Sequence, residues 1–262
     1  MQKAKIAIIG GTGFEKLFKE AEQLQIETPY GPSPLLFLGK IEGKNIVFLP
    51  RHGVDHSFPP HRINYRANVY SLHKIGVKRI FATNAVGAIN RSFKPGDLVV
   101  PHDFVDFTKH RPTTFYDEAP VTHVDVSKPY CEENRKLLLE TARKLGLHAW
   151  DKAVLVCTEG PRFETPAEIE MFRRLNCDIV GMTGFPEVVL ARELEMCYAA
   201  ICCVSNMAAG IQDRLPAFEV SKLSKNVLPK VEQLLIETVK ASPLERSGNC
   251  SCSRALNNAR IK

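Results

Sequence analysis

The stretch Cys177-Asp178-Ile179-Val180-Gly181-Met182-Thr183-Gly184-Phe185-Pro186-Glu187 shows how this chain alternates between strand and helix. Residues 177–182 form a largely apolar run, which is typical of a strand covered on both faces. Pro186 and Glu187 favour the start of a helix directly afterwards, and Thr183 lies between the two elements. A strand followed at once by a helix is the repeating unit of α/β folds, so this stretch indicates that fold class.

The same alternation extends along most of the chain. The sequence has 262 residues, of which 44% are hydrophobic and 24% charged, so it can form one large domain with a sizeable core. We therefore predict a single-domain α/β fold with a central, mostly mixed β-sheet flanked by helices. Beyond this domain, residues 1–241, the composition becomes polar, so 242–262 is predicted to be a mobile C-terminal tail. Strands are predicted at 5–9, 35–39, 45–50, 78–83, 97–100, 152–157, 178–182 and 198–205, and helices at 65–76, 133–146, 166–174, 186–195 and 219–241.

The composition argues against several classes of partner. The net charge is only +6 and the basic residues are scattered, so we expect no nucleic-acid partner. No apolar run reaches the roughly 20 residues needed to cross a bilayer, so we expect no membrane association. The chain enters a predicted strand at Lys5 without the pattern of a signal peptide, which favours a cytoplasmic location.

Two of the eight cysteines, Cys250 and Cys252, lie in the polar tail. With no other cysteine or histidine close to them in sequence, they form a poor zinc site, so we predict no bound metal. A disulfide, either within the tail or back to the domain, is the preferred prediction, and it would be typical of a hyperthermophile. Two unpaired thiols at a loose chain end are an equally open alternative.

Polar residues follow several of the predicted strands, where ligands gather in α/β sheets. Arg51 ends the strand 45–50, and its planar guanidinium matches phosphate or carboxylate oxygens. Thr12 lies in a glycine-rich turn suited to a small anion, although a plain tight turn is the alternative. Met182 offers an apolar surface to a sugar or base, or else belongs to the core. The candidate anion-binding residues are Thr12, Arg51, His52, Asn84, Ala85 and Thr183.

The segment Thr158-Glu159-Gly160-Pro161-Arg162-Phe163-Glu164-Thr165, together with Asn206, supplies an aromatic ring, a carboxylate and a carboxamide. These groups suit the recognition of a flat, hydrogen-bonding heterocycle. Thr165 and Glu168 form the sequence pattern of a capping box with Pro166 at the first helical position, which would hold Glu164 in place. The alternative is that Glu164 is an ordinary acid at a helix start.

With these motifs assembled, the chain strongly resembles the trimeric class of purine nucleoside phosphorylases, in the branch that includes methylthioadenosine phosphorylase. The resemblance runs from about Lys5 to Lys240. Its most specific motifs lie at 10–14, 51–53, 64–68, 95–97, 111–117, 159–165 and 182–187.

The resemblance implies a pentosyltransferase that uses phosphate as co-substrate, needs no cofactor and assembles as a homotrimer or a dimer of trimers. It implies that phosphate is bound by the six candidate anion-binding residues. It also implies that Arg51, Glu164 and Asn206 are catalytic. The residues implied to bind the nucleoside are Phe163, Glu164, Met182, Asn206, Met207 and Ala208.

Two residues depart from the pattern of the branch. Members of the branch that this chain resembles and that favour 6-aminopurines carry an aspartate at the position of Asn206. They carry a small hydroxyl residue at the position of Glu164. A carboxylate accepts a hydrogen bond from N1–H of a 6-oxopurine, and a carboxamide can donate to O6. We therefore predict a purine-salvage enzyme that converts inosine and guanosine into free purine and ribose 1-phosphate.

Two other functions remain open at the level of sequence. The first is methylthioadenosine or methylthioinosine phosphorolysis, which depends on the 5′ side of the nucleoside site, where His56 and the 216–220 region are candidates. The second is a catalytically silent nucleoside-binding protein, which the presence of Arg51 disfavours.

Overall fold

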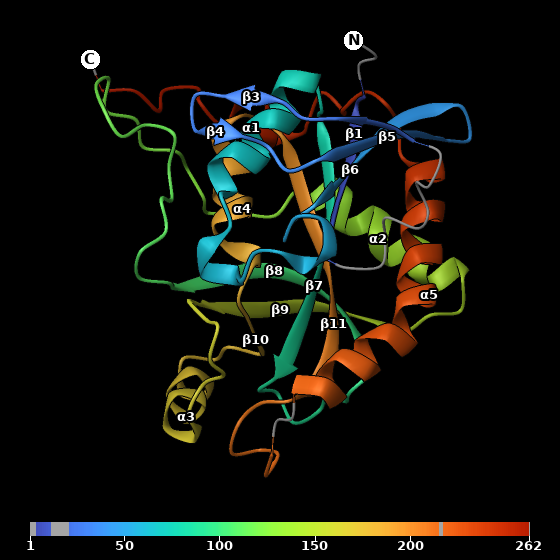
Figure 1. The fold of residues 1–262 in the computed structure, drawn as a ribbon, viewed down its shortest axis with the longest axis vertical. Helices are drawn as coiled ribbons and strands as arrows, with labels where there is room; N and C mark the ends of the chain where they lie inside the picture. Colours follow the sequence, from blue (N-terminus) through green and yellow to red (C-terminus); the bar gives the residue numbers. More distant parts are fainter. Residues whose placement is uncertain (1–3, 12–20, 215–216, 262) are drawn as a thin grey trace.

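The computed structural model describes residues 4–11, 21–214 and 217–261, and the side chains of 217–226 lie outside this description. A nine-stranded sheet forms its centre, in the order β10-β9-β8-β11-β7-β1-β6-β5-β2 (Figure 1). The strands of this sheet are β1 (Ile6–Gly10), β2 (Glu22–Leu24), β5 (Leu36–Ile41), β6 (Lys44–Pro50), β7 (Arg79–Ala88), β8 (Leu98–Phe107), β9 (Ala149–Thr158), β10 (Ile179–Gly181) and β11 (Cys197–Met207).

Parallel and antiparallel pairs are mixed in this sheet, as predicted. β1 runs parallel to β6 and β7, and β7 runs parallel to β11. β10 pairs in parallel with β9 and in antiparallel with β7, which closes the five strands β7, β11, β8, β9 and β10 into a small barrel. A separate hairpin, β3 (Glu27–Thr28) and β4 (Gly31–Pro32), lies at the rim.

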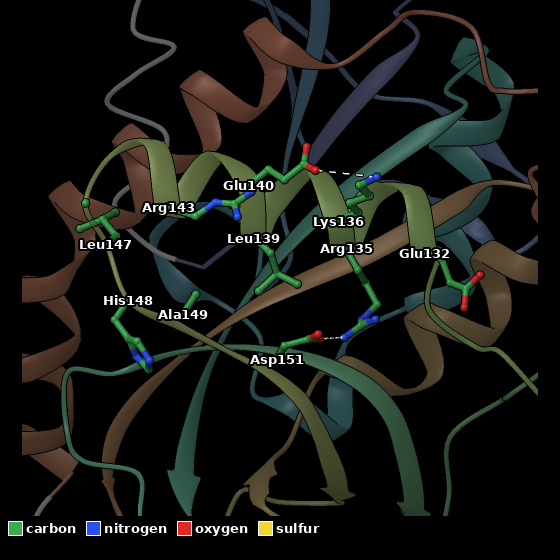
Figure 2. A pocket seen from close by; sticks show the side chains of 11 residues that line it. Glu132, Arg135, Lys136, Leu139, Glu140, Arg143, Leu147, His148, Ala149 and Asp151 are labelled. Carbon is green, nitrogen blue, oxygen red and sulfur yellow. Dashed lines mark hydrogen bonds and ion pairs between the residues drawn. The ribbon is translucent and has the colours of Figure 1, made fainter.

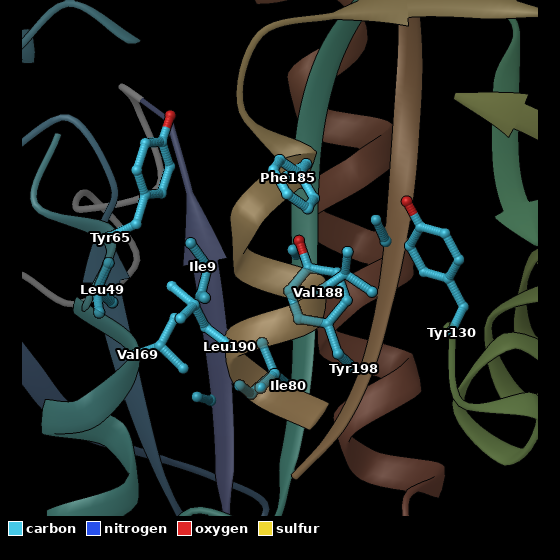
Figure 3. Packing of buried hydrophobic residues seen from close by; sticks show 14 of the residues in the cluster. Ile9, Leu49, Tyr65, Val69, Ile80, Tyr130, Phe185, Val188, Leu190 and Tyr198 are labelled. Atoms are coloured by element: carbon cyan, nitrogen blue, oxygen red, sulfur yellow. The ribbon is translucent and has the colours of Figure 1, made fainter. Parts of the chain in front are cut away.

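Helices cover both faces of the sheet. They are α1 (Tyr65–Ile75), α2 (Glu132–Lys144), α3 (Pro166–Arg174), α4 (Gly184–Glu193) and α5 (Ala217–Ala241). Along β1 the side chains alternate: Ile6 and Ile8 pack with α2 and α5, and Ala7 and Ile9 pack with α1 and α4. Figure 3 shows the second of these clusters, with Ile9 close to residues of α1 and α4. Because both faces of β1 are buried, the strand is apolar throughout.

Capping residues define where α3 and α4 begin, and both helix starts lie beside candidate ligand-binding residues. Thr165 accepts from the Glu168 amide at 3.1 Å and the Glu168 carboxylate accepts from the Thr165 amide at 2.8 Å, which confirms the predicted capping box of α3. Thr183 is the N-cap residue of α4. No helix in the described part of the chain is both long and apolar enough to cross a membrane.

The C-terminal tail differs from the predicted mobile end, because it packs against the domain. Buried Arg79 donates from Nε to the Pro243 carbonyl at 3.1 Å and from Nη2 to the Glu245 carbonyl at 3.0 Å. The His123 amide donates to the Ala259 carbonyl at 2.8 Å, and both tail cysteines are buried. Polar composition predicts mobility, but backbone carbonyls of the tail and its two buried cysteine side chains contact the domain, and composition does not reveal such contacts.

Candidate active site

Arg51 lies directly after β6 and is fixed by groups from two other elements. Its Nε and Nη2 atoms donate to the two carboxylate oxygens of Glu187 on α4, at 2.5 and 2.9 Å, and Nη1 donates to the Thr83 carbonyl at 2.7 Å. Burial lowers the pKa of Arg51, but the charge of Glu187 outweighs burial and raises that pKa above its ordinary value. Three of the five guanidinium N–H groups are thus used within the described residues, which leaves two for a ligand.

The end of β7 and the start of α4 meet beside Arg51. The Thr183 hydroxyl donates to Oδ1 of Asn84 at 3.0 Å, and both side chains are buried. Ala85 is exposed, so a ligand can approach the backbone of β7 there. The structure therefore brings Arg51, Asn84, Ala85 and Thr183 together at one end of the sheet. A guanidinium, a carboxamide and the start of a helix at one place favour an anion.

His52 follows Arg51 and is held in one orientation. Its Nδ1 lies 2.8 Å from the Phe58 carbonyl, and its ring stacks on His56 with the centroids 4.1 Å apart. Burial and the neighbouring Arg51 charge lower the pKa of His52 to about 4. A neutral ring with Nδ1–H bonded to a carbonyl presents Nε2 as an acceptor, which can receive a hydrogen bond from a protonated phosphate oxygen.

Glu164 lies between the end of β9 and the start of α3. The hydroxyl of Thr158 donates to Oε1 of Glu164 at 2.7 Å and lies 3.4 Å from the Gly181 carbonyl. This hydroxyl links the Glu164 carboxylate to the segment that leads into Thr183. Glu164 is half-buried, so its carboxylate is oriented by the protein and still accessible.

Asn206 is the last residue but one of β11, where the pairing with β7 shifts its register between Val204 and Asn206. Such an irregularity re-aims a side chain at the end of a strand. Ser205 donates its hydroxyl to Oδ1 of Asn206 at 2.7 Å, and Nδ2 donates to the Met207 carbonyl at 2.9 Å. One amide hydrogen and one lone pair of the carboxamide remain for a ligand.

Met182 joins the Glu164 segment to the anion-binding residues. It is half-buried, and a Cβ placed on Gly160 would lie only 2.6 Å from its Sδ atom. Arg111 spans both segments: Nη1 donates to the Met182 carbonyl at 2.7 Å, and Nη2 donates to the Glu159 carbonyl at 2.7 Å. The relative position of Met182 and Glu164 therefore depends on Arg111.

The remaining predicted residues lie in different surroundings. Thr12 falls outside the described residues. Phe163 is half-buried beside Glu164, and Met207 is partly buried against the core. Ala208 is 1% exposed and packs in a core cluster with Val180 and Ile169, so its methyl group is covered by protein.

Three residues of this region were not predicted as members of the site. Glu187 forms the ion pair with Arg51, and Tyr198 donates its hydroxyl to Oε2 of Glu187 at 2.8 Å. Arg111 connects the Met182 and Glu159 carbonyls. Glu187 and Arg111 lie in motifs quoted above, so their presence was visible in the sequence. Their partners are far away along the chain, and sequence spacing gives no signal for such pairs.

A pocket of about 720 Å³ lies elsewhere, between α2 and β9, and none of the candidate residues lines it. Figure 2 shows its charged side chains pairing among themselves, as Arg135 does with Asp151 and Lys136 with Glu140. These pairs leave little unbalanced charge for a ligand, so this pocket is not the candidate active site.

Comparison with known proteins assigns the chain to a family. The model of the phosphorylase superfamily matches residues 5–240. A relative from Methanopyrus kandleri, named probable S-methyl-5′-thioinosine phosphorylase, is 52% identical and covers 98% of this chain and 99% of its own. A relative from Dictyoglomus turgidum, named probable 6-oxopurine nucleoside phosphorylase, is 47% identical over 98% of both chains.

A solved structure gives the same assignment. A methylthioadenosine phosphorylase from an Antarctic soil metagenomic library superposes with a TM-score of 0.93 at 32% identity, over 100% of this chain and 93% of its own. Further relatives at 45–48% identity are named for S-methyl-5′-thioadenosine or S-methyl-5′-thioinosine.

These names correct one prediction. The expectation that inosine and guanosine are the substrates is wrong, because four of the relatives and the solved structure described above are named for nucleosides that carry a 5′-methylthio group. The prediction weighed only the edge of the purine that faces Glu164 and Asn206. The names differ from that prediction at the 5′ side of the nucleoside, where His56 and the 216–220 region were candidates without assigned contacts.

The fold of the chain agrees with the assignment to this family. The mixed sheet, the closed barrel and the helices on both faces match the fold of the solved relative across the whole chain. The protein is therefore a member of the phosphorylase superfamily, in the methylthioadenosine phosphorylase branch of the purine nucleoside phosphorylases, and a pentosyltransferase.

Proposed function

We propose that this enzyme cleaves S-methyl-5′-thioinosine with inorganic phosphate, giving hypoxanthine and S-methyl-5-thioribose 1-phosphate. Two independent lines support this substrate. The names of the similar proteins favour a 5′-methylthio group, and that of the Methanopyrus kandleri relative adds a 6-oxopurine base. The residues at the base side of the site favour a 6-oxopurine for a chemical reason.

The choice of base rests on two side chains that the structure orients, the carboxylate of Glu164, held by Thr158, and the carboxamide of Asn206, held by Ser205. A 6-oxopurine has a donor at N1 and an acceptor at O6, which match an ionised carboxylate and an amide N–H group. A 6-aminopurine has an acceptor at N1, which would face the lone pairs of Glu164. Mispairing of this kind costs about 1–3 kcal/mol, or roughly ten- to hundredfold in affinity.

Phosphate would be held by Arg51, His52, Asn84, Ala85 and Thr183, with Thr12 as a further predicted donor. The two N–H groups that Arg51 has left can bind two phosphate oxygens in a fixed direction. Phosphate bound in this way would present an oxygen nucleophile to C1′ of the sugar, and Met182 would contact the sugar itself. Positioning of the two reactants supplies a large part of the rate in such a reaction.

The C1′–N9 bond breaks as positive charge develops on the sugar and negative charge on the departing purine. Asn206 would stabilise the purine by accepting a hydrogen bond from N7–H and donating to O6. Its carboxamide is already oriented by Ser205 and by the Met207 carbonyl, so little reorganisation is needed. Glu164 would hold N1–H. Hydrogen phosphate loses its proton when its oxygen bonds to C1′, and the departing purine gains one proton at N7, where Oδ1 of Asn206 would then accept the hydrogen bond.

The test is a comparison of four substrates with the purified enzyme: methylthioinosine, methylthioadenosine, inosine and adenosine, each with and without phosphate. We expect base release only with phosphate, and the highest kcat/KM for methylthioinosine, about tenfold or more above methylthioadenosine. A tenfold preference for methylthioadenosine, or base release without phosphate, would contradict the proposal.

Variants at the base side make the test specific. Glu164→Gln exchanges an acceptor for a donor at one carboxylate oxygen, so we expect kcat/KM for methylthioinosine to fall about tenfold or more. Glu170→Gln is the matched control, because Glu170 lies on the exposed surface of α3, where it pairs with Arg173 and Arg174. Equal effects of the two substitutions would remove Glu164 from the base site.

From the family resemblance alone we further propose assembly as a homotrimer or a dimer of trimers and a cytoplasmic location. On the same ground we propose that the reaction uses phosphate without an organic cofactor. The 216–220 region, which was predicted to shape the 5′ side, lies where the structure describes no side chains.

A further inference from the structure

Four cysteines from distant parts of the sequence meet at one place in the fold. The sulfur atoms of Cys131, Cys197, Cys250 and Cys252 all lie within 4.8 Å of one another, and all four residues are buried. The sulfur atoms of Cys197 and Cys250 are 3.4 Å apart. Four sulfur ligands at the usual zinc–sulfur distance of about 2.3 Å lie roughly 3.8 Å apart, so this cluster has nearly the size of a tetrahedral site.

The four residues come from two rigid parts of the domain and one short turn of the tail. Cys131 is the N-cap residue of α2, and Cys197 is the first residue of β11. Cys250 and Cys252 belong to a short 3-10 turn, with Cys250 as N-cap and Cys252 inside it. Cys250 and Cys252 have no companion cysteine or histidine close to them in sequence, but in space they have two, Cys131 and Cys197.

The surroundings of the cluster favour negative charge on the sulfurs. Buried Arg192 lies on α4, and its Nη1 donates to the sulfur of Cys252 at 3.6 Å. Its Nε donates to the Asp125 carbonyl at 3.0 Å, which holds the guanidinium in this position. The start of the 13-residue helix α2 at Cys131 adds the positive end of a helix dipole. A cation and a helix start beside a cysteine stabilise its thiolate, the form that binds metal.

We propose that these four cysteines bind one zinc ion in a closed, structural tetrathiolate site that fastens the C-terminal tail to the domain. Four thiolates are a soft ligand set that suits zinc in tetrahedral geometry, and no ligand position is left for catalysis. Cys197 and Asn206 lie at opposite ends of β11, roughly 30 Å apart for an extended strand of that length. The site is therefore separate from the candidate active site.

A tetrathiolate site and a pair of disulfides require different bonding states of the same four sulfurs and different distances between them. In the zinc site all four are thiolates at van der Waals distances from one another, and in disulfides they are joined in pairs by bonds of about 2.0 Å. All eight cysteines are free thiols in the structure, and the cluster sulfurs surround a common centre. This arrangement favours the metal over the disulfide that the sequence predicted.

The test is the metal content of the full-length protein, purified without chelators from cells supplied with zinc. We expect about one zinc ion per chain by elemental analysis. Under denaturing conditions without reductant, we expect all four cluster cysteines to be alkylated once zinc is chelated. Absence of zinc together with a mass deficit of two hydrogens per cysteine pair would overturn the proposal. Free thiols with no bound metal would also overturn it, and so would iron bound in place of zinc.

Two variants separate the cluster from the other cysteines. Cys252→Ser replaces one sulfur ligand by a hydroxyl on a side chain of nearly the same shape, and we expect zinc content to fall at least about tenfold. Cys177→Ser is the matched control, because Cys177 is buried outside the cluster, and we expect its zinc content to equal that of the unmodified chain. Equal zinc content in both variants would overturn the proposal.

Replacement of zinc by cobalt gives a readout that does not require any variant to fold. We expect sulfur-to-cobalt charge-transfer bands and the visible spectrum of a tetrahedral complex. A spectrum of octahedral cobalt would contradict the assignment. Metal content and cobalt spectra do not depend on the substrate, so they can fail while the proposed phosphorolysis holds, and the reverse is also true.

Discussion

Glu187 binds Arg51 through both of its carboxylate oxygens, and the pair is buried in the layer between the sheet and α4. The hydroxyl of Tyr198 donates to Oε2 of the same carboxylate at 2.8 Å. Glu187 thereby fixes the plane of the guanidinium and decides which of its N–H groups face a ligand. The proposed phosphate site depends on a residue that does not itself face phosphate.

Removing the charge of Glu187 is expected to affect both stability and phosphate binding. In Glu187→Gln the buried Arg51 charge loses its partner, which costs about 3–5 kcal/mol of unfolding free energy. We also expect KM for phosphate to rise more than KM for the nucleoside. Tyr198→Phe is the milder comparison, because it removes one hydrogen bond worth about 1 kcal/mol. Urea unfolding and phosphate titrations check both variants, and a normal phosphate KM in Glu187→Gln would refute this role.

His52 should make stability depend on pH. Its pKa in the folded protein is about 4, below the ordinary value of 6.5, mainly because of burial. The unfolded chain therefore binds the proton more tightly, and this contribution to stability is present above pH 6.5 and is lost as the pH falls toward 4. We expect the unfolding free energy to fall by on the order of 2 kcal/mol between pH 6.5 and pH 4, after allowance for the partial exposure of the ring.

The comparison of the unmodified chain with His52→Asn isolates this effect. Urea unfolding at pH 7 and at pH 4.5 gives the pH dependence of each protein, and the difference between them belongs to His52. We expect the variant to lose less stability on acidification. An identical pH dependence would show that His52 does not titrate with the predicted shift.

Arg111 is expected to act by positioning Glu164 relative to Met182. It donates to carbonyls of Thr158, Glu159, Met182 and Phe185 at 2.7–3.1 Å. Lysine cannot bridge this set, so Arg111→Lys should lower the unfolding free energy by about 2–4 kcal/mol and reduce kcat/KM. Arg162→Lys is a suitable control, because Arg162 is exposed and pairs with Glu168. Thermal unfolding and steady-state kinetics measure both effects, and equal results for the two variants would contradict the role.

Gly87 is expected to protect the orientation of Asn206. A Cβ atom at Gly87 would lie 3.1 Å from Nδ2 of Asn206 and 3.2 Å from Val180, so the carboxamide would have to move. Gly87→Ala should lower kcat/KM for methylthioinosine by about tenfold, since small misplacements of a reacting group are costly. Gly248→Ala has open space around its Cβ and is the control. Unchanged kinetics in Gly87→Ala would show that the carboxamide tolerates displacement.

Much of the fold could be predicted from sequence because its signals are local. The eight predicted strands and five predicted helices are all present, with boundaries that differ by a few residues except where β7, β8 and β9 extend further. The two- and three-residue strands β2, β3 and β4 were missed, because such short pieces carry no periodicity. Closure of the barrel through β10 and β7 is a long-range pairing that no local pattern encodes.

The candidate site was predictable as a set of polar residues at strand ends. Arg51, Asn84 and Thr183 lie together at one end of the sheet, whereas Ala208 is covered by protein. What supports them could not be predicted. Glu187 meets Arg51, and Cys197 meets Cys250, only because the sheet and the tail bring distant segments together. The polar tail shows the same limit, because Arg79 binds its backbone carbonyls and not its side chains.

The most direct test of the central claim is the ratio of kcat/KM for methylthioinosine to that for methylthioadenosine, measured in the unmodified enzyme and in Asn206→Asp. The claim predicts a ratio of about ten or more that falls at least tenfold in the variant, since an aspartate can no longer donate to O6. A ratio below one in the unmodified enzyme, or a ratio that Asn206→Asp leaves unchanged, would contradict it.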